Sequence, residues 1–243
     1  QDIILVRLLG PKVEYTGVVA GMSGSPVYLE GKLAGALSLK LGIFTKEAVA
    51  GVTPIESVLD ADAAAGVPGT ATASSAAPLQ FPAPPDVAER IGLGGGTYFT
   101  PIETPLIFSG FDPEVLRRYA ADFAAYGLVA APGGTVAAQP DDAQVKPGDM
   151  VSMVLLQGDL SISGACTVTA VAGDRVYACG HPIFGFGTVA LPMARGRVIT
   201  TLPSQMASTK IVNAGGTIGT ITQDRVTAIL GRLGPAPRMI PME

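Results

Sequence analysis

Short apolar runs separated by turn residues recur along most of the chain, and this pattern predicts a mostly β protein. The runs have the length of strands and carry many β-branched side chains. The runs at 26–29 and 33–39 flank Glu30-Gly31-Lys32 and predict a hairpin. Strands are expected at residues 3–9, 18–20, 26–29, 33–39, 48–52, 150–157, 165–171, 175–179, 188–192, 198–202, 216–222 and 225–229.

Two stretches carry helical signals instead. Residues 113–126 predict an amphipathic helix, because Asp112 is a good N-cap residue and Gly127 is a good terminator. Residues 53–59 predict a shorter helix with Thr53 as its N-cap. The longer helix has an apolar stripe, which predicts that it packs on the protein and binds no ligand. The stripe consists of Val115, Leu116, Tyr119, Phe123 and Tyr126.

Shifts in composition divide the chain into four segments. They are a β segment at 1–60, a flexible linker at 61–96, a strand and amphipathic helix at 97–147, and a second β segment at 148–243. The linker is predicted because residues 61–85 are mostly Ala, Gly, Ser, Thr and Pro. The run 97–109 resembles one strand interrupted by prolines. The glycines at 94–96 and 215–216 lack the setting of a phosphate-binding loop, and turns are the favoured interpretation.

Composition excludes several classes of protein. The 31 glycines and 20 prolines, with no tryptophan, favour many short strands over a helical bundle. A net charge of −4 with scattered cations predicts no nucleic-acid partner. No apolar run approaches the ~18–20 residues that a membrane-spanning helix needs. One histidine and two cysteines predict no metal site, and no cofactor is expected.

The two cysteines, Cys166 and Cys179, flank a predicted hairpin. Folding the chain about Ala172-Gly173 sets them opposite each other, at a separation that a disulfide can bridge. A pair of buried thiols is the alternative, and the sequence leaves both open. A disulfide would favour an exported protein.

One hexapeptide carries the chemistry of a nucleophile. Gly21-Met22-Ser23-Gly24-Ser25-Pro26 lies between two apolar runs and predicts a tight turn that presents the Ser23 hydroxyl. A serine nucleophile needs a base for its proton and donors for the oxyanion, and the N–H groups of Gly21 and Ser23 are the candidate donors. A strand follows this turn, whereas a helix follows the serine of an α/β-hydrolase.

Two segments resemble the SpoIVB-type serine peptidases, a chymotrypsin-like family of signalling proteases. The first segment is Gly17–Tyr28 in the sequence GVVAGMSGSPVY, followed by the runs at 31–36 and 51–56. The second, VYACGHPI, resembles the histidine segment of the family and assigns the general base to His181, the only histidine. The resemblance implies a double β-barrel with one or two short helices. It also implies a protein or peptide substrate, cut in regulation or self-processing.

The chain departs from the family pattern in two ways. Ser23 precedes His181, whereas the family order is the reverse, and this implies a permuted or incomplete barrel pair. Gly10 stands where the family has its aspartate, so the nearest carboxylate, Glu14, is the candidate acid. Asp174 would lie about 20 Å from His181 along its hairpin, too far to orient the imidazole. The alternatives are a Ser–His dyad without an acid and an acid supplied from outside this chain.

Two other classes of protein fit the same residues. One is a non-catalytic β-rich envelope or binding module that kept the peptidase scaffold, and the other is an inactive fragment. The chain opens inside a predicted strand without methionine, so we expect a processed product or an excised piece. The missing part of its precursor is then a candidate partner. The expected location is outside the cytoplasm, exported or in the cell envelope of a bacterium.

Overall fold

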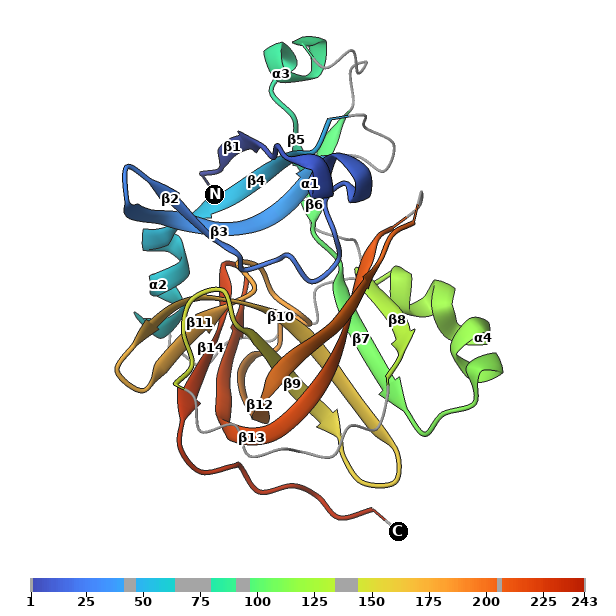
Figure 1. Ribbon diagram of the computed structural model, residues 1–243. Coiled ribbons are helices and arrows are strands. Elements are labelled where there is room, and N and C mark those ends of the chain that lie inside the picture. Colours follow the sequence, from blue (N-terminus) through green and yellow to red (C-terminus); the bar gives the residue numbers. More distant parts are fainter. Residues whose placement is uncertain are drawn as a thin grey trace.

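The computed structural model describes residues 2–41, 47–63, 80–90, 97–133, 144–204 and 207–242. The fold is mostly β, as predicted, and its strands form two sheets stacked one above the other (Figure 1). One sheet closes into a barrel and the other forms a half-barrel. This arrangement is consistent with the predicted double β-barrel in which the second barrel is incomplete.

The closed barrel is built from the second half of the chain. Its strands, in spatial order, are β11 (Arg175–Ala178), β14 (Ala228–Leu233), β13 (Thr209–Arg225), β12 (Gly187–Leu202), β9 (Met150–Leu156) and β10 (Ser161–Ala172). Pairing of β10 with β11 closes the ring, and all its pairs are antiparallel. Outside the ring, β7 (Thr104–Ser109) pairs with β10, and β8 (Leu128–Pro132) runs parallel to β7. The interior is apolar and includes Val151, Met153, Val168, Met193, Ile221 and Ile229.

The half-barrel is built from the first hundred residues or so. Its strands are β1 (Ile4–Arg7), β2 (Pro26–Leu29), β3 (Lys32–Leu41), β4 (Val49–Pro54), β5 (Phe81–Pro82) and β6 (Tyr98–Pro101). Strand β3 is central, because it pairs with β4 along one side and with β2 and β6 along the other. A small core of Leu37, Ala50, Val52 and Ile102 holds this sheet together.

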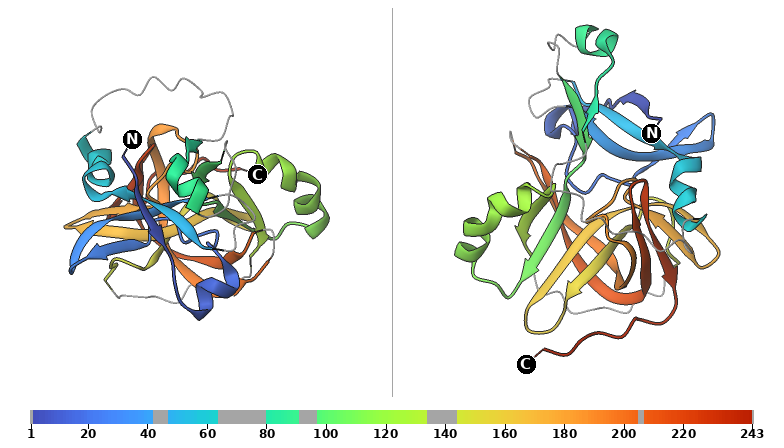
Figure 2. Two further views of the ribbon diagram at one scale, coloured as in Figure 1. Left: turned by 90° about the horizontal axis from the view of Figure 1, so that it is seen from above. Right: turned by 180° about the vertical axis from the view of Figure 1, so that it is seen from behind.

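The chain passes from one sheet to the other within the predicted strand 97–109. That stretch forms two strands, β6 in the half-barrel and β7 beside the closed barrel. Residues Ile102 and Glu103 connect them, and we call 102–103 the crossing segment. The Ile102 side chain is fully buried, which fixes the crossing segment at the junction of the sheets. The closed barrel and the half-barrel are seen from two further directions in Figure 2.

The described residues contain four short helices, where one or two were predicted. They are α1 (Pro11–Thr16), α2 (Ile55–Ala63), α3 (Pro85–Arg90) and α4 (Pro113–Ala124). The predicted linker at 61–96 is interrupted by the end of α2, by β5 and by α3. The rest of that linker, at 64–79 and 91–96, lies outside the described residues. None of the helices in the described part of the chain has the length and apolar character needed to span a bilayer.

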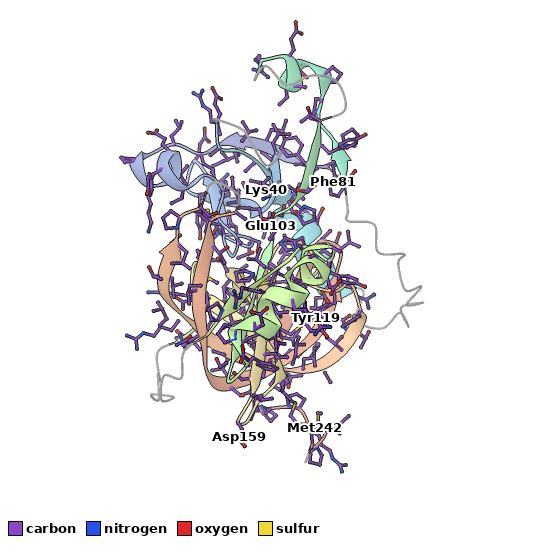
Figure 3. The ribbon with its side chains drawn as sticks, turned by 90° about the vertical axis from the view of Figure 1, so that its right-hand side faces the viewer. Lys40, Phe81, Glu103, Tyr119, Asp159 and Met242 are labelled. Carbon is purple, nitrogen blue, oxygen red and sulfur yellow. A yellow bond between two sulfur atoms is a disulfide. The ribbon has the colours of Figure 1, made fainter. Side chains whose placement is uncertain are left out.

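Helix α4 confirms the predicted cap and corrects the predicted packing. The Glu114 N–H donates to Asp112 Oδ1 over 2.7 Å, so Asp112 is the N-cap. Leu116 is buried and Phe123 packs on Phe108, with ring centroids 5.2 Å apart. The rest of the stripe, Val115, Tyr119 and Tyr126, is exposed because α4 lies on the outside of β7 and β8 and buries only a narrow face (Figure 3).

Several predicted boundaries are wrong for physical reasons. Thr53 does not cap α2, because β4 continues to Pro54. The runs at 188–192 and 198–202 belong to one strand, β12, and the glycines at 215–216 lie inside β13 instead of in a turn. Register shifts between β12 and β13 mark β-bulges, which let long strands bend without ending. Residues 18–20 form only an isolated bridge, between Ala20 and Thr209.

Candidate functional site

The Ser23 turn lies at the junction of the two sheets and is bonded to both. The Gly24 N–H donates to Leu37 O of β3 over 2.7 Å. On the other side, the Thr167 N–H donates to Ser23 O over 2.8 Å, and Thr169 Oγ1 donates to Gly24 O over 2.8 Å. The turn is therefore fixed between β3 of the half-barrel and β10 of the closed barrel.

Close packing explains the glycine that follows the serine. Gly24 has a φ of 88°, a conformation that favours glycine. A Cβ at this position would lie 1.9 Å from Thr167 O, closer than any side chain can come. Direct contact with β10 therefore requires glycine at position 24.

Ser23 itself is fully buried. Its Oγ has no hydrogen-bond partner in the described part of the chain. A buried hydroxyl left without a partner costs about 1–3 kcal/mol and calls for an explanation.

His181 reaches the same junction from the closed barrel. Two residues in left-handed conformations precede it, Cys179 with φ 70° and Gly180 with φ 72°. A Cβ on Gly180 would lie 2.8 Å from the Cβ of Ala36 on β3, and Thr53 Oγ1 donates to Gly180 O over 2.9 Å. Neighbouring residues of β3 therefore hold both the Ser23 turn and the His181 loop.

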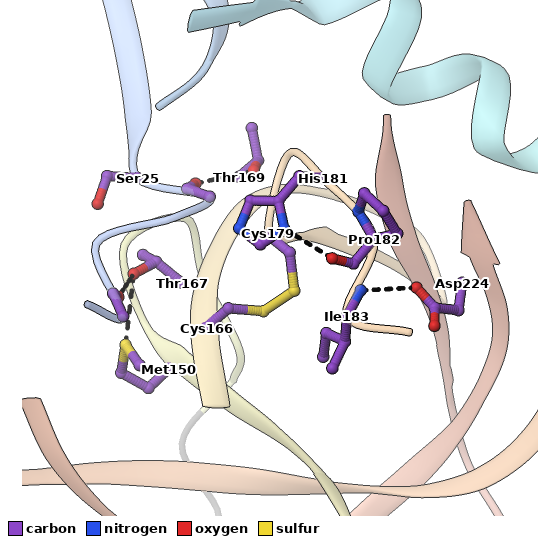
Figure 4. Close-up of a disulfide and its surroundings, with 12 residues drawn as sticks. Ser25, Met150, Cys166, Thr167, Thr169, Cys179, His181, Pro182, Ile183 and Asp224 are labelled. Atoms are coloured by element: carbon purple, nitrogen blue, oxygen red, sulfur yellow. Dashed lines mark hydrogen bonds between the residues drawn. A yellow bond between two sulfur atoms is a disulfide. The ribbon is translucent and has the colours of Figure 1, made fainter. Parts of the chain in front are cut away.

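The hydrogen bonding of His181 selects one tautomer. Nδ1 lies 2.7 Å from Pro182 O, and a carbonyl only accepts, so Nδ1 carries the proton and Nε2 has a free lone pair (Figure 4). The ring is almost fully buried, and Nε2 has no partner among the described residues. Burial lowers the pKa of His181, and the Pro182 carbonyl, the Asp224 charge, the Ile102 carbonyl and the Glu103 charge oppose this effect in part. A neutral imidazole with a free Nε2 has the form of a general base.

The two predicted catalytic groups are not bonded to each other in this conformation. Ser23 Oγ and His181 Nε2 both lack partners, so the Ser–His hydrogen bond of a working dyad is not formed. Each group nevertheless stands on a segment that contacts residues 36–38 of β3. The structure brings the two segments together and leaves the bond between them unmade.

The candidate acid Glu14 makes a hydrogen bond at the start of its own helix. It lies on α1, and its Oε1 accepts the Gly10 N–H over 3.2 Å in an exposed position. No contact joins it to His181 among the described residues. At Nδ1 of the imidazole, where a triad has its carboxylate, the Pro182 carbonyl stands instead.

A buried carboxylate that sequence reasoning missed shapes the loop after His181. Asp224 accepts the N–H groups of Ile183, Phe184 and Gly185, each over 2.9 Å. Figure 4 shows the bond from Ile183. Burial raises the pKa of Asp224, and these backbone bonds counteract the rise. The available signal was an aspartate between two predicted apolar strands. Asp224 holds the loop that carries His181 and does not contact the imidazole nitrogens.

The N–H group of Gly21, a candidate oxyanion donor, is already hydrogen-bonded to the crossing segment. Its N–H donates to Glu103 O over 3.1 Å. The Glu103 carboxylate pairs with Lys40 Nζ at 2.5 Å, and both side chains are largely buried at the level where the sheets meet (Figure 3). An oxyanion could accept from the Gly21 N–H only after the Glu103 carbonyl has moved away.

Cys166 and Cys179 form a disulfide with an S–S distance of 2.03 Å, so the free-thiol alternative is wrong. The pairing differs in detail from the predicted one, because the turn is Gly173-Asp174 and Ala178 stands opposite Val168. A register shift in β10 and the left-handed Cys179 bring the two sulfurs together. The disulfide joins the strand beneath the Ser23 turn to the start of the His181 loop (Figure 4).

No group of three or more metal-ligating side chains gathers anywhere in the described ranges. Comparison of the chain with family models, with curated proteins and with solved structures finds no match.

Proposed function

We propose that this chain is a serine endopeptidase of the SpoIVB type, with Ser23 as nucleophile and His181 as general base. One observation carries the proposal: two buried polar atoms, Ser23 Oγ and His181 Nε2, lack partners at the same junction. Buried polar groups are normally satisfied, so each exception calls for an explanation, and a catalytic role is one. The resemblance of both segments to that family's serine and histidine segments supports the same assignment.

The chemistry follows from the groups present. Ser23 Oγ attacks the carbonyl carbon of a peptide bond while His181 Nε2 takes the hydroxyl proton. His181 then gives this proton to the leaving amine, and water hydrolyses the acyl-enzyme. The Pro182 carbonyl orients the ring through Nδ1, the task of the aspartate in a triad, so the site is a Ser–His dyad. The N–H groups of Ser23 and Gly21 stabilise the oxyanion once Glu103 O has moved.

The substrate is a protein or peptide, cut in regulation or in self-processing. The disulfide supports an exported or cell-envelope location, because such bonds persist in oxidising compartments.

The test is covalent labelling by a fluorophosphonate probe, followed by intact-mass analysis. We expect one adduct on the wild type and none on Ser23→Ala or His181→Ala. Ser25→Ala is the matched control, because its hydroxyl lies in the same turn but donates to Met22 O over 2.7 Å. The control should label like the wild type. A folded wild-type chain that never forms the adduct would refute the proposal.

A non-catalytic binding module is the second candidate. It is favoured by the complete burial of Ser23 and by the Glu103 carbonyl on the Gly21 N–H. In that case the serine turn is structural, and the probe leaves a folded wild-type chain unlabelled at every concentration.

A further inference from the structure

Lys210 is bonded to the Ser23 turn through its backbone and through its side chain. It lies near the start of β13, and its N–H donates to Ala20 O over 3.1 Å. Its Nζ donates to Gly21 O over 3.0 Å. Successive peptide planes of the turn, Ala20-Gly21 and Gly21-Met22, are therefore held by one residue.

The side chains within hydrogen-bonding distance of Lys210 Nζ are uncharged. Thr167 Oγ1 donates to the same Gly21 carbonyl over 3.0 Å and lies 3.5 Å from Nζ, while Met150 Sδ lies 3.7 Å away. No carboxylate in the described part of the chain pairs with this ammonium. A mostly buried cation without a counter-ion destabilises a fold, so stability alone does not account for Lys210.

We propose that Lys210 is a positioning residue for the Ser23 turn. The bond to Ala20 O fixes the peptide plane that carries the Gly21 N–H, the candidate oxyanion donor. The bond from Nζ fixes the next plane, which leads to Ser23. This inference rests on the proposed peptidase function, because the geometry it preserves is that of nucleophile and oxyanion donor.

The protonation state of Lys210 changes within the ordinary experimental pH range. Burial, and after it the like charge of Lys12 on α1, lower its pKa to about 8. The other groups that face Nζ are the Met150 thioether from β9 and the Thr167 hydroxyl from β10, and neither titrates. Above pH 8 the ammonium becomes an amine, and its hydrogen bond to Gly21 O weakens.

The test is the rate of fluorophosphonate labelling of the full chain as a function of pH. We expect Lys210→Met to label about 10–100-fold more slowly than the wild type at pH 7, as misplaced groups do. Lys210→Arg should recover part of the rate and keep it above pH 8, because guanidinium stays charged.

Two further variants make the pH readout specific. Lys12→Met removes the like charge and should move the alkaline fall in rate to higher pH. Lys32→Met removes an exposed charge from the β2–β3 hairpin and should leave the profile unchanged. If Lys210 had only a structural role, Lys210→Met would also have a lower melting temperature than the wild type. We expect this variant to be at least as stable as the wild type at pH 7.

The outcomes separate the two proposals. If the wild type labels, but Lys210→Met labels at the same rate with the same alkaline fall, the positioning role is wrong and the peptidase remains. If the wild type does not label, the peptidase fails. The NMR chemical shift of the Gly21 carbonyl carbon then tests the contact between Lys210 Nζ and Gly21 O independently of labelling. It should shift with a midpoint near pH 8 in the wild type and stay constant in Lys210→Met, and a constant signal in both overturns the inference.

Discussion

At the scale of single residues, the described part of the chain has two buried polar atoms without partners and one mostly buried cation without a counter-ion where the sheets meet. Ser23 Oγ and His181 Nε2 are buried without partners, and Lys210 carries a charge without a counter-ion. Each of these features lowers stability when taken alone. Their shared location is what the proposed peptidase site requires.

Ser23→Ala is expected to leave the stability unchanged or to raise it by up to about 1 kcal/mol, because it removes a buried hydroxyl that makes no bond. Ser38→Ala is the matched control, since Ser38 is equally buried but shares a 2.8 Å hydrogen bond with Thr53. The control should lose about 1 kcal/mol or more. Urea denaturation measures both, and a large loss in Ser23→Ala would contradict an unpartnered hydroxyl.

His181 makes stability depend on pH in a definite direction. Burial lowers its pKa in the folded state, so below pH 6.5 the unfolded chain binds a proton that the folded chain refuses. Stability should therefore fall as the pH drops through this range, by up to about 1.4 kcal/mol per pH unit. The chain has no other histidine, so His181→Leu should abolish this component in urea titrations between pH 7 and 5.

At the scale of elements, β3 and the loop after His181 position the site. Residues 36–38 of β3 contact both the Ser23 turn and Gly180, while Asp224 on β13 gathers the backbone N–H groups that follow His181. The hairpin of β2 and β3 and the cap of α4 were predictable, because their turn and cap residues act locally. The crossing between sheets and the length of β13 were not, because buried contacts far away in the sequence determine them.

Asp224→Ala should destabilise the protein by about 3 kcal/mol or more, because three backbone N–H groups lose a buried acceptor. Asp224→Asn keeps one acceptor oxygen and should lose less. Asp112→Ala, which removes only the cap of α4, should lose about 1 kcal/mol. Hydrogen exchange should locate the change at the amides of Ile183, Phe184 and Gly185, and unchanged protection there would argue against this anchor.

At the scale of the whole molecule, side-chain hydroxyls join the two sheets. Thr53 reaches Gly180 from the half-barrel, and Thr167 and Thr169 reach Gly21 and Gly24 from the closed barrel. Short apolar runs separated by turn residues predicted the mostly β fold, and the hexapeptide and the single histidine predicted two residues of the candidate site. Lys210 and Asp224 both lie in β13, and the sequence does not reveal which distant residues these side chains contact.

The disulfide should resist reduction while the protein is folded, because both cysteines are fully buried and thiolate attack needs access to sulfur. Alkylation and intact-mass analysis after treatment with dithiothreitol should find no modified cysteine in native buffer and two in denaturant. Replacing both cysteines by alanine should lower the free energy of unfolding by about 3 kcal/mol. Rapid reduction of the native protein would contradict the buried bond.

The burial of Ser23, in a turn that is bonded to the crossing segment through Gly21, has a kinetic consequence. A ligand can meet a fully covered hydroxyl only in molecules that have opened, so the opening step precedes every encounter. As probe concentration rises, the observed rate should stop increasing and level off at the opening rate of the protein. That plateau should be the same for probes of different reactivity. The plateau rate should be higher in Lys40→Met, because this variant lacks the ion pair between Lys40 and Glu103 of the crossing segment.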